Sequence, residues 1–271
     1  MGELLAAGGC WNANRFARDG AGAGLRDWVS DVEGDADMID TDVLILAVCI
    51  DADDMNDATS ATFKIQWANH TDAPTTWNDL ASTGEIKWAT TSDLVDGATV
   101  VAAEDSGGNT NCTAKGWSRR DGLEKEGANG FTRTIVQDAF EEFHWAIDLS
   151  GADSINGDQY KFRLTQSDGT VIGTGLGLLT VNIAGKIEGI TKNADRSAVV
   201  TGVTVSAFLS DGASPNPKPT ATLRSQAVSH ATTGVYSLPD LFSGFDYFLH
   251  FYKDATDDLS DGSGPVTAVD A

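Results

Sequence analysis

The acidic run from Asp51 to Asp57 (DADDMND) holds the side chains best suited to chemistry. Asp51, Asp53 and Asp57 would offer Ca²⁺ several hard carboxylate oxygens, which are the ligands that this ion prefers. A helix–loop–helix calcium site starting here would also need an acidic ligand at position 55 and Glu at position 62, where Met and Thr stand. The run therefore fits a solvated loop at a strand end better than a metal site, and a Ca²⁺ site at Asp51, Asp53 and Asp57 is the alternative.

The remaining reactive residue types show no catalytic spacing. The four histidines, His70, His144, His230 and His250, are scattered and are expected at the surface. Glu141 and Glu142 are adjacent, so on a strand they would face opposite sides and make a poor acid–base pair. No helix is expected after the Gly-rich run at residues 173–177, which excludes a dinucleotide-binding turn. The sequence predicts a protein that is not an enzyme and that needs no cofactor.

Tryptophan is the second residue type with functional potential, and all seven copies precede residue 146. Trp67, Trp88 and Trp145 are expected in a core. Trp77 and Trp117 lie in turn-rich sequence, where exposed rings could stack on sugars or anchor a protein interface. Near the N-terminus, Trp11 and Trp28 are candidate anchors for the same kind of interface.

Composition favours strands and turns over helices. Asp outnumbers Glu by 31 to 9, and Asp prefers turns and helix caps while Glu prefers helix interiors. The net charge is −22, with only 18 Lys and Arg, which argues against a nucleic-acid partner. An acidic exterior keeps a protein soluble and hydrated.

Cysteine usage and hydropathy restrict the cellular setting. Cys10, Cys49 and Cys112 are odd in number and irregular in spacing, so thiols are expected, while a Cys49–Cys112 disulfide stays open. The N-terminal residues are not expected to form a signal peptide, because no basic stretch precedes an apolar core. No apolar run approaches the roughly 18 residues of a membrane span, so no membrane insertion is expected.

Residues 1–37 differ from the rest and are predicted to form an extended, Gly-rich N-terminal arm. Residues 38–183 are predicted to form one β-sandwich. Apolar residues alternate with polar ones in ATFKIQWANH, FHWAIDLS and GDQYKFRLTQSDG, as half-buried strands require. Gly157 and the turn at Ser167-Asp168-Gly169 separate such strands.

Residues 184–271 are predicted to form a second β-sandwich. Val203, Val205 and Ala207 alternate with Thr204 and Ser206, which is typical of a strand with one buried face. The loop that follows, DGASPNPKPTA, contains three prolines, which exclude a central strand there. A final long strand is expected in FDYFLHFY.

This C-terminal part resembles the carboxypeptidase-regulatory-like domain, a transthyretin-like β-sandwich. The resemblance rests on Gly202-Val203-Thr204-Val205, on Gly234-Val235-Tyr236-Ser237-Leu238, and on Gly244-Phe245-Asp246-Tyr247, which is one residue longer than the family pattern. It covers about 70 residues and implies a non-catalytic accessory module of surface and secreted proteins.

The N-terminal sandwich resembles the Ig-like modules of phage virion proteins and of exported bacterial repeats. Tyr160 stands at the position of the Ig tyrosine, and Phe162 replaces the core cysteine two residues later. The resemblance implies an all-β chain with two sandwiches in series, Ig-like and then transthyretin-like.

These features together predict a structural virion protein of a bacteriophage, either a head decoration protein or a fibre-like appendage. Expected partners are other virion proteins of the capsid or tail and further copies of the chain. A host surface or a glycan is a further candidate partner. The alternative is an extracellular carbohydrate- or protein-binding adhesion module of a bacterial surface protein. The expected location is the virion, or otherwise the cell surface or the secreted fraction.

Overall fold

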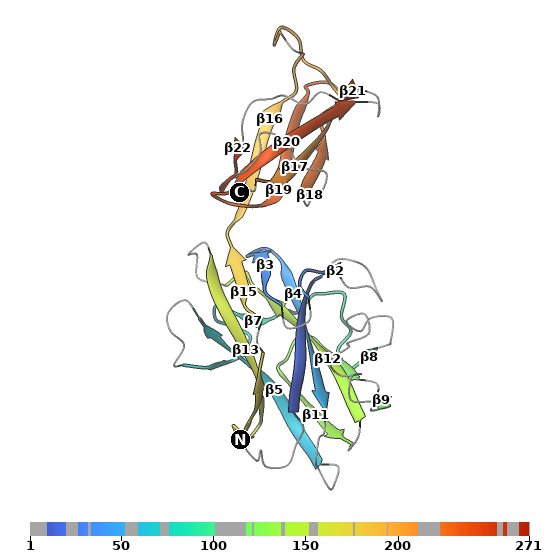
Figure 1. Ribbon diagram of the computed structural model, residues 1–271, viewed down its shortest axis with the longest axis vertical. Coiled ribbons are helices and arrows are strands. Elements are labelled where there is room, and N and C mark those ends of the chain that lie inside the picture. Colours follow the sequence, from blue (N-terminus) through green and yellow to red (C-terminus); the bar gives the residue numbers. More distant parts are fainter. Residues whose placement is uncertain are drawn as a thin grey trace. The chain divides into compact units, whose positions relative to one another are not determined.

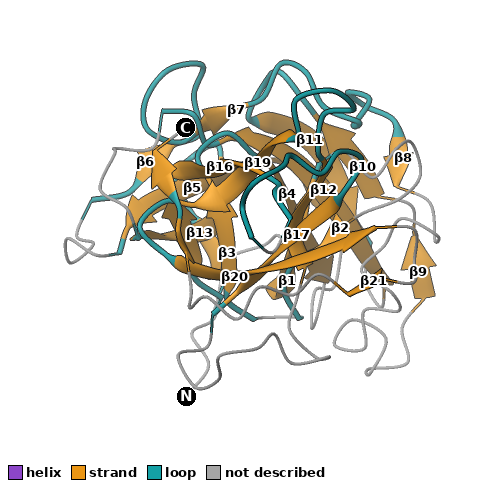
Figure 2. Cartoon of the chain, turned by 90° about the horizontal axis from the view of Figure 1, so that it is seen from above, coloured by secondary structure: helices purple, strands orange, loops and turns teal. Residues whose placement is uncertain are grey.

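The protein is described by a computed structural model. It describes residues 10–19, 27–31, 34–51, 59–70, 76–100, 118–120, 122–136, 139–151, 157–175, 177–193, 195–210, 223–253, 257–258 and 266–270. Within these ranges every regular element is a β-strand, joined by turns and loops (Figure 2). The expected all-β fold class is therefore confirmed for this part of the chain.

The chain divides into two compact units, Met1–Val181 and Asn182–Ala271. The boundary predicted at residue 184 lies two residues into the second unit. Each unit has its own hydrophobic core, because each pairs strands whose apolar side chains alternate with polar ones. The likeness of the two units to the Ig and transthyretin families stays a prediction.

The first unit is built on an eight-stranded sheet, sheet I (Figure 1). Its main path runs in the order β2 (Asp27–Trp28), β1 (Cys10–Arg18), β4 (Val43–Asp51), β12 (Ala139–Asp148), β10 (Gly122–Lys125) and β8 (Thr99–Val100). Two short strands, β7 (Lys87–Trp88) and β9 (Ser118–Arg120), also pair with β12. Strand β12 pairs with β4 over nine residues, from Phe140↔Asp51 to Asp148↔Val43.

The prediction of an arm at residues 1–37 is wrong for Cys10–Arg18. This segment is strand β1, which pairs antiparallel with β4 from Cys10↔Asp51 to Arg18↔Leu44. Phe16 is fully buried, and its ring lies 6.1 Å from that of Phe162. The short run of apolar residues in β1 gives little periodic signal, and its place in the sheet is decided by pairing with β4, which is distant in sequence.

A second sheet of seven strands, sheet II, forms the other layer of the first unit. Its main path runs β11 (Gly130–Ile135), β5 (Thr59–Asn69), β13 (Asp158–Gln166), β15 (Leu179–Asn182) and β3 (Ala36–Ile39). In addition, β14 (Val171–Thr174) pairs with β13, and β6 (Asn78–Asp79) pairs with β5. The hairpin predicted around Ser167-Asp168-Gly169 is present as β13 and β14.

Aromatic side chains fill the space between sheets I and II. Phe131 stacks on Phe143 with ring centroids 4.3 Å apart, and Trp145 lies 5.2 Å from Phe131. Trp67 and Trp145 are buried as the sequence predicts, while Trp88 is half-buried at the margin of this core. Burial of such large rings is the main free-energy gain of the unit.

The second unit also contains two sheets. One has the order β19 (Val235–Phe242), β16 (Ala184–Ile190) and β23 (Val269–Asp270). The other has the order β18 (Leu223–Val228), β17 (Thr204–Leu209), β20 (Asp246–Lys253) and β21 (Asp257–Asp258), with β22 (Val266–Thr267) paired to β20. Val205, Leu238 and Tyr247 lie in their common core, and the backbone N–H of Phe242 donates a 2.7 Å hydrogen bond to the Tyr247 hydroxyl.

Gly122 is required by the close approach of β10 to β12. A Cβ at this residue would lie 1.7 Å from the backbone oxygen of Glu142, whereas one at Gly130 would meet only ordinary van der Waals contacts, the nearest at 3.5 Å. We expect Gly122→Ala to lower the free energy of unfolding of the first unit by roughly 2–4 kcal/mol.

The matched variant Gly130→Ala should change that free energy by no more than about 0.5 kcal/mol. Urea unfolding followed by tryptophan fluorescence measures the effect in the first unit alone, because every tryptophan lies there. Equal stability of the two variants would contradict the close strand approach.

Candidate functional site

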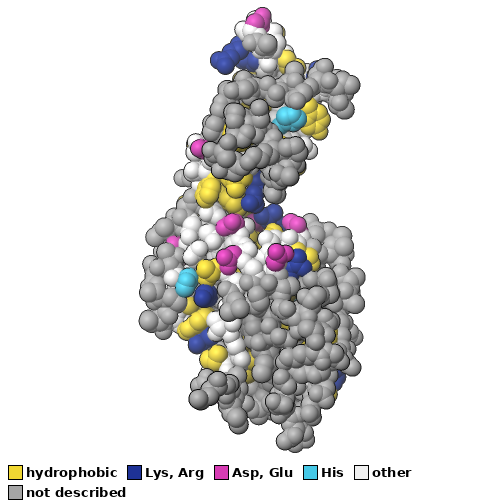
Figure 3. Space-filling view, viewed as in Figure 1, with side chains coloured by type: hydrophobic (Ala, Val, Ile, Leu, Met, Phe, Trp, Pro, Cys, Tyr) yellow, Lys and Arg dark blue, Asp and Glu magenta, His cyan; other side chains and the backbone are white. Residues whose placement is uncertain are grey.

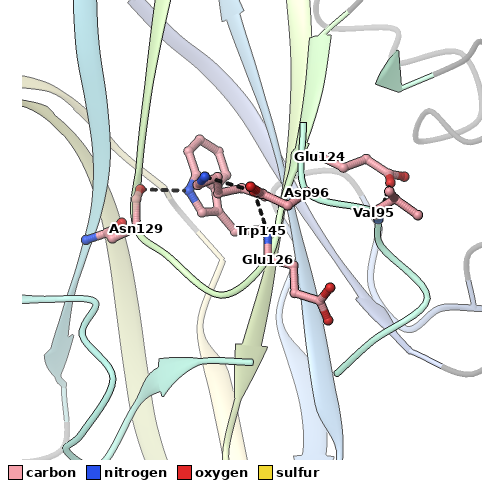
Figure 4. A network of polar contacts seen from close by, with 7 residues as sticks. Val95, Asp96, Glu124, Glu126, Asn129 and Trp145 are labelled. Carbon is pink, nitrogen blue, oxygen red and sulfur yellow. Dashed lines mark hydrogen bonds and ion pairs between the residues drawn. The ribbon is translucent and has the colours of Figure 1, made fainter. Parts of the chain in front are cut away.

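A network of charged and polar groups lies at the C-terminal end of β10 and in the turn that follows it (Figure 4). The Lys125 Nζ lies 2.8 Å from Asp96 Oδ1, and the backbone N–H of Val95 donates a 2.7 Å hydrogen bond to Glu124 Oε2. Glu124 itself is buried. The network therefore ties the loop before β8 to β10 and satisfies a carboxylate that would be costly to bury alone.

The hydrogen bond from Lys125 holds the pKa of Asp96 below its ordinary value. A carboxyl group whose pKa is lower in the folded protein stabilises the fold at pH values above its unfolded pKa. That contribution is lost as the pH falls through the folded pKa. The ion pair is thus in place at neutral pH, and its role is to fix the loop.

Asn129 connects the two sheets of the first unit. Its side-chain amide donates to the backbone oxygen of Ile65 and accepts from the backbone N–H of Ile65, both at 2.8 Å. Its backbone oxygen accepts a 3.2 Å hydrogen bond from Trp145 Nε1 (Figure 4). One residue therefore satisfies buried donors and acceptors from β5 in sheet II and from β12 in sheet I.

A second polar cluster lies on the side of sheet I that faces away from the main core. His144 Nε2 lies 2.9 Å from Glu142 Oε1, and the Trp28 ring packs edge-on against His144 with centroids 6.1 Å apart. The Arg15 guanidinium stacks over the same indole at 4.8 Å. The strand register explains the grouping, because Arg15 and His144 both pair with Ala47 of β4.

Two residues of this cluster, His144 and Glu142, are closed to solvent. His144 is 0% exposed and Glu142 is 2% exposed, which corrects the expectation that the histidine lies at the surface. Burial lowers the pKa of Arg15, and the charges of Asp31 and Glu142 oppose that effect. A side chain with no solvent access cannot reach a substrate in this arrangement. The cluster is instead suited to joining β12 to β1 and β2.

Glu141 points to the opposite side of β12 and is also paired. Arg133 Nε donates to Glu141 Oε2 at 2.7 Å, and Arg120 Nε lies 3.7 Å from Oε1. The carboxylate is 0% exposed. Glu141 and Glu142 thus form two separate buried ion clusters, in agreement with the prediction that they are not an acid–base pair.

The outward face of sheet II carries an open polar group around Trp77. The Arg163 guanidinium lies over the Trp77 ring at 4.3 Å and donates a 2.7 Å hydrogen bond to Gln66 Oε1. Gln66 in turn donates to Asp79 Oδ1 at 2.6 Å. Desolvation lowers the pKa of Arg163, and Asp79 opposes that effect.

Several predicted site residues lie outside the described part of the chain. Asp53, Asp57 and Trp117 fall there, and only the backbones of Asp51 and Trp11 are described, in β4 and β1. Among the residues that are described, no three His, Cys, Asp or Glu side chains are arranged to hold a metal ion. The calcium hypothesis for Asp51, Asp53 and Asp57 stays a prediction.

The described tryptophan candidates occupy different surroundings. Trp28 is half-buried against His144 and Arg15, and Trp77 is half-buried under Arg163. The structure does not bring these two residues into one site. The sequence pointed to both residues only because they are tryptophans. The arginine that stacks on each ring, Arg15 on Trp28 and Arg163 on Trp77, could be identified only from the tertiary structure.

Cys49 is disulfide-bonded, which corrects the expectation of three thiols and agrees with the alternative, left open by the sequence, that Cys49 takes part in a bridge; whether Cys112 is its partner stays a prediction. Its partner is one of the other two cysteines, whose side chains lie outside the described residues. Cys49 itself is buried on β4, opposite Glu142. Stable disulfides are typical of proteins that work in oxidising surroundings.

No family model matches the chain, and no curated protein matches it. Among solved structures, the T6 backbone pilin of serotype M6 Streptococcus pyogenes shares 8% identity at a TM-score of 0.29, over 94% of this chain and 52% of the pilin chain. The full-length major pilin SpaD from Corynebacterium diphtheriae shares 9% identity at 0.26, over 89% and 55%. The chain thus spans about half the length of either pilin.

A third similar structure is native alpha-2-macroglobulin from Escherichia coli, spanning domains NIE–MG1. It shares 11% identity at a TM-score of 0.19, over 94% of this chain and 97% of that chain. Similarities at these TM-scores assign neither family nor function. In the described residues no helix is long and apolar enough to cross a membrane.

Asn129→Ala should lower the free energy of unfolding of the first unit by about 1–3 kcal/mol, because it leaves the buried backbone N–H of Ile65 without its partner, while the Ile65 carbonyl keeps the 3.1 Å hydrogen bond from the backbone N–H of Leu80. The matched control is Asn78→Ala, on an exposed residue of β6, with an expected change within about 0.5 kcal/mol. Tryptophan fluorescence during urea unfolding measures both. An Asn129→Ala variant as stable as the control would show that Asn129 does not join the sheets.

The disulfide predicts a thiol count that chemistry can check. The denatured chain should expose one thiol without reductant and three after reduction, since one disulfide uses two of the three cysteines. Loss of the bond in Cys49→Ser should cost about 2–4 kcal/mol of stability. Three reactive thiols without reductant, measured by alkylation and intact mass, would contradict the bond.

Proposed function

We propose that this chain is a non-enzymatic structural subunit of an extracellular assembly, and specifically a bacteriophage virion protein that decorates the head or forms part of a fibre-like appendage. The observation that carries the proposal is the burial of three ionisable side chains of β12 in the first unit. Glu141, Glu142 and His144, the residue types that could act as acids or bases, are buried and paired with protein groups. Their contacts support a role in holding strands together.

Three further features support a role outside the cell. Cys49 is in a disulfide, which persists in oxidising surroundings. The net charge of −22 keeps a surface hydrated and limits non-specific association. Two β-sandwich units in series expose long strand faces and loops, which are the parts of such modules that usually meet partners.

The proposed mechanism is mechanical. Each sandwich acts as a rigid body, because its core is one continuous cluster of buried apolar side chains. The Arg133–Glu141 ion pair, which joins β11 of sheet II to β12 of sheet I, and the Asn129 bridge resist sliding of one sheet against the other. A subunit of this kind transmits load or covers neighbouring subunits without changing its internal structure.

Fractionation of a culture that produces the chain tests the proposal. Virions banded in a density gradient should contain the chain in a fixed ratio to the major capsid protein, as measured by quantitative mass spectrometry, while a cytosolic enzyme serves as the negative control. Recovery in the cell-envelope or secreted fraction, with none in the virions, would keep the extracellular role and reject the virion. Recovery with the cytosolic control would reject both.

The second candidate function is a carbohydrate- or protein-binding adhesion module, favoured by the open group of Trp77, Arg163 and Gln66. A glycan array with the purified chain tests it, comparing wild type with Trp77→Ala, Trp117→Ala and, as an aromatic control in the other unit, Tyr252→Ala. Binding that is lost in Trp77→Ala or Trp117→Ala and kept in Tyr252→Ala supports this candidate. An array without hits, or equal loss in all three variants, rejects it.

A further inference from the structure

Five of the seven strands of sheet II have a charge balance opposite to that of the unit around them, while the other two, β3 and β6, carry the carboxylates Asp37 and Asp79. The first unit carries 12 Lys and Arg against 30 Asp and Glu, a net charge of −18. Strands β11, β5, β13, β14 and β15 nevertheless hold four cations and one carboxylate. These are Lys64, Arg133, Lys161 and Arg163 as cations, and Asp158 as the carboxylate.

The cations divide between the two faces of the sheet. Arg133 points inward to Glu141. On β13, Tyr160, Phe162 and Leu164 lie in the core, so strand alternation puts Lys161 and Arg163 on the outward face. On β5 the same alternation, with Phe63 and Ile65 inside, puts Lys64 outward beside them.

The acidic counterpart lies on the same face, at the β3 edge. Ala36 and Met38 are in the core, which places the exposed Asp37, and Asp35 just before the strand, on the outward side. The segment is held beside Leu178, whose backbone oxygen accepts from Ala36 at 2.9 Å and whose N–H donates to Asp35 at 2.8 Å. In Figure 3, several acidic side chains lie close together on the described surface of the larger unit, with Lys and Arg side chains beside them.

The two charged pairs match in spacing. Lys161 and Arg163 are two residues apart, as are Asp35 and Asp37, so each pair spans roughly 7 Å along its strand. Strand β15 separates β13 from β3, which puts the pairs about 10 Å apart across the sheet. At that separation the two cations do not form direct ion pairs with the two carboxylates of the same copy. Both charged pairs are therefore available to a partner on the outward face.

We propose that the outward face of sheet II is a two-fold interface between copies of this chain, in which Lys161 and Arg163 of one copy pair with Asp35 and Asp37 of the other. A two-fold interface needs a self-complementary patch, in which residue i meets j and j meets i. A patch with a cationic centre and an acidic edge meets that requirement. A second copy is favoured as the occupant because the complementary charge is already present at the same spacing.

Arg163 is prepared for this contact. Its guanidinium is held by the Trp77 ring and by Gln66, so less side-chain freedom is lost on association. Thr62 and Thr132, whose hydroxyls are 2.8 Å apart, extend the same face with small polar side chains. The inference rests on the proposed function, since it names how such a subunit would contact its own copies.

Sedimentation equilibrium of the purified full-length chain tests the interface. Wild type should form a dimer whose dissociation constant rises between about 0.05 M and about 0.5 M salt, because exposed ion pairs are screened. Lys161→Glu and Asp37→Lys should each raise the dissociation constant at least about tenfold, since each reversal acts twice in a two-fold dimer. The double variant restores opposite charges and should return to within about threefold of wild type.

Lys192→Glu with Arg196→Glu is the matched control, because both residues are exposed in the second unit, and it should leave the dissociation constant unchanged. Four results would each overturn the interface. The first two are a wild-type chain that is monomeric at low salt and single variants whose dissociation constant equals that of wild type. The other two are a double variant whose dissociation constant stays as high as those of the single variants and a control variant whose dissociation constant rises equally. None of these results bears on whether the chain is found in virions, so the proposed function is tested separately.

Discussion

Strand β12 is covered on both faces, and this double burial constrains most of the polar contacts in the first unit. One face contributes Phe143, Trp145 and Ile147 to the core between the sheets. The other face carries Glu142, His144 and Ala146, which are also buried. A charged or polar group inside a protein is tolerated only when a partner satisfies it, so each ionisable residue of β12 has to be met by a group from another element.

The partners come from other strands, and most of them are distant in the sequence, although Arg133 lies only eight residues before Glu141. Arg15 and Trp28 approach His144 from the N-terminal strands, while Arg120 and Arg133 enclose Glu141. These pairs give the unit specificity of packing more than net stability, because the desolvation of buried charges offsets much of their attraction. Closure of the same groups leaves them without the access to a substrate that a catalytic acid or base needs.

Charge is distributed unevenly over the first unit. Acidic residues dominate the loops and the β3 edge, while the strands of sheet II carry Lys64, Lys161 and Arg163 on their outward face. An acidic exterior favours solubility, and a local cationic face within it favours contacts with a complementary surface. In the first unit, the acidic loops favour solubility, while the cationic outward face of sheet II favours association.

Much of the fold could be predicted from local pattern. The alternation in β5, β12 and β13 predicted strands and their inward residues, and Trp67 and Trp145 are in the core as expected. Strand β1 was missed because its pairing with β4 joins residues that are 26 to 41 positions apart, from Arg18↔Leu44 to Cys10↔Asp51, and no local period reports such a pairing. His144 was expected at the surface because alternation separates the two faces of a strand and cannot reveal that both are covered.

The sequence by itself determined the all-β class, the chain of two modules and the acidic character, because alternation, turn residues and charge are properties of the residues in order. The tertiary structure decided which polar residues meet. It placed Arg163 over Trp77, enclosed His144 with Trp28, put Cys49 in a disulfide, and aligned two cations with two carboxylates on one face of a sheet. Strand register sets these contacts, and register depends on pairing between segments that the sequence keeps apart.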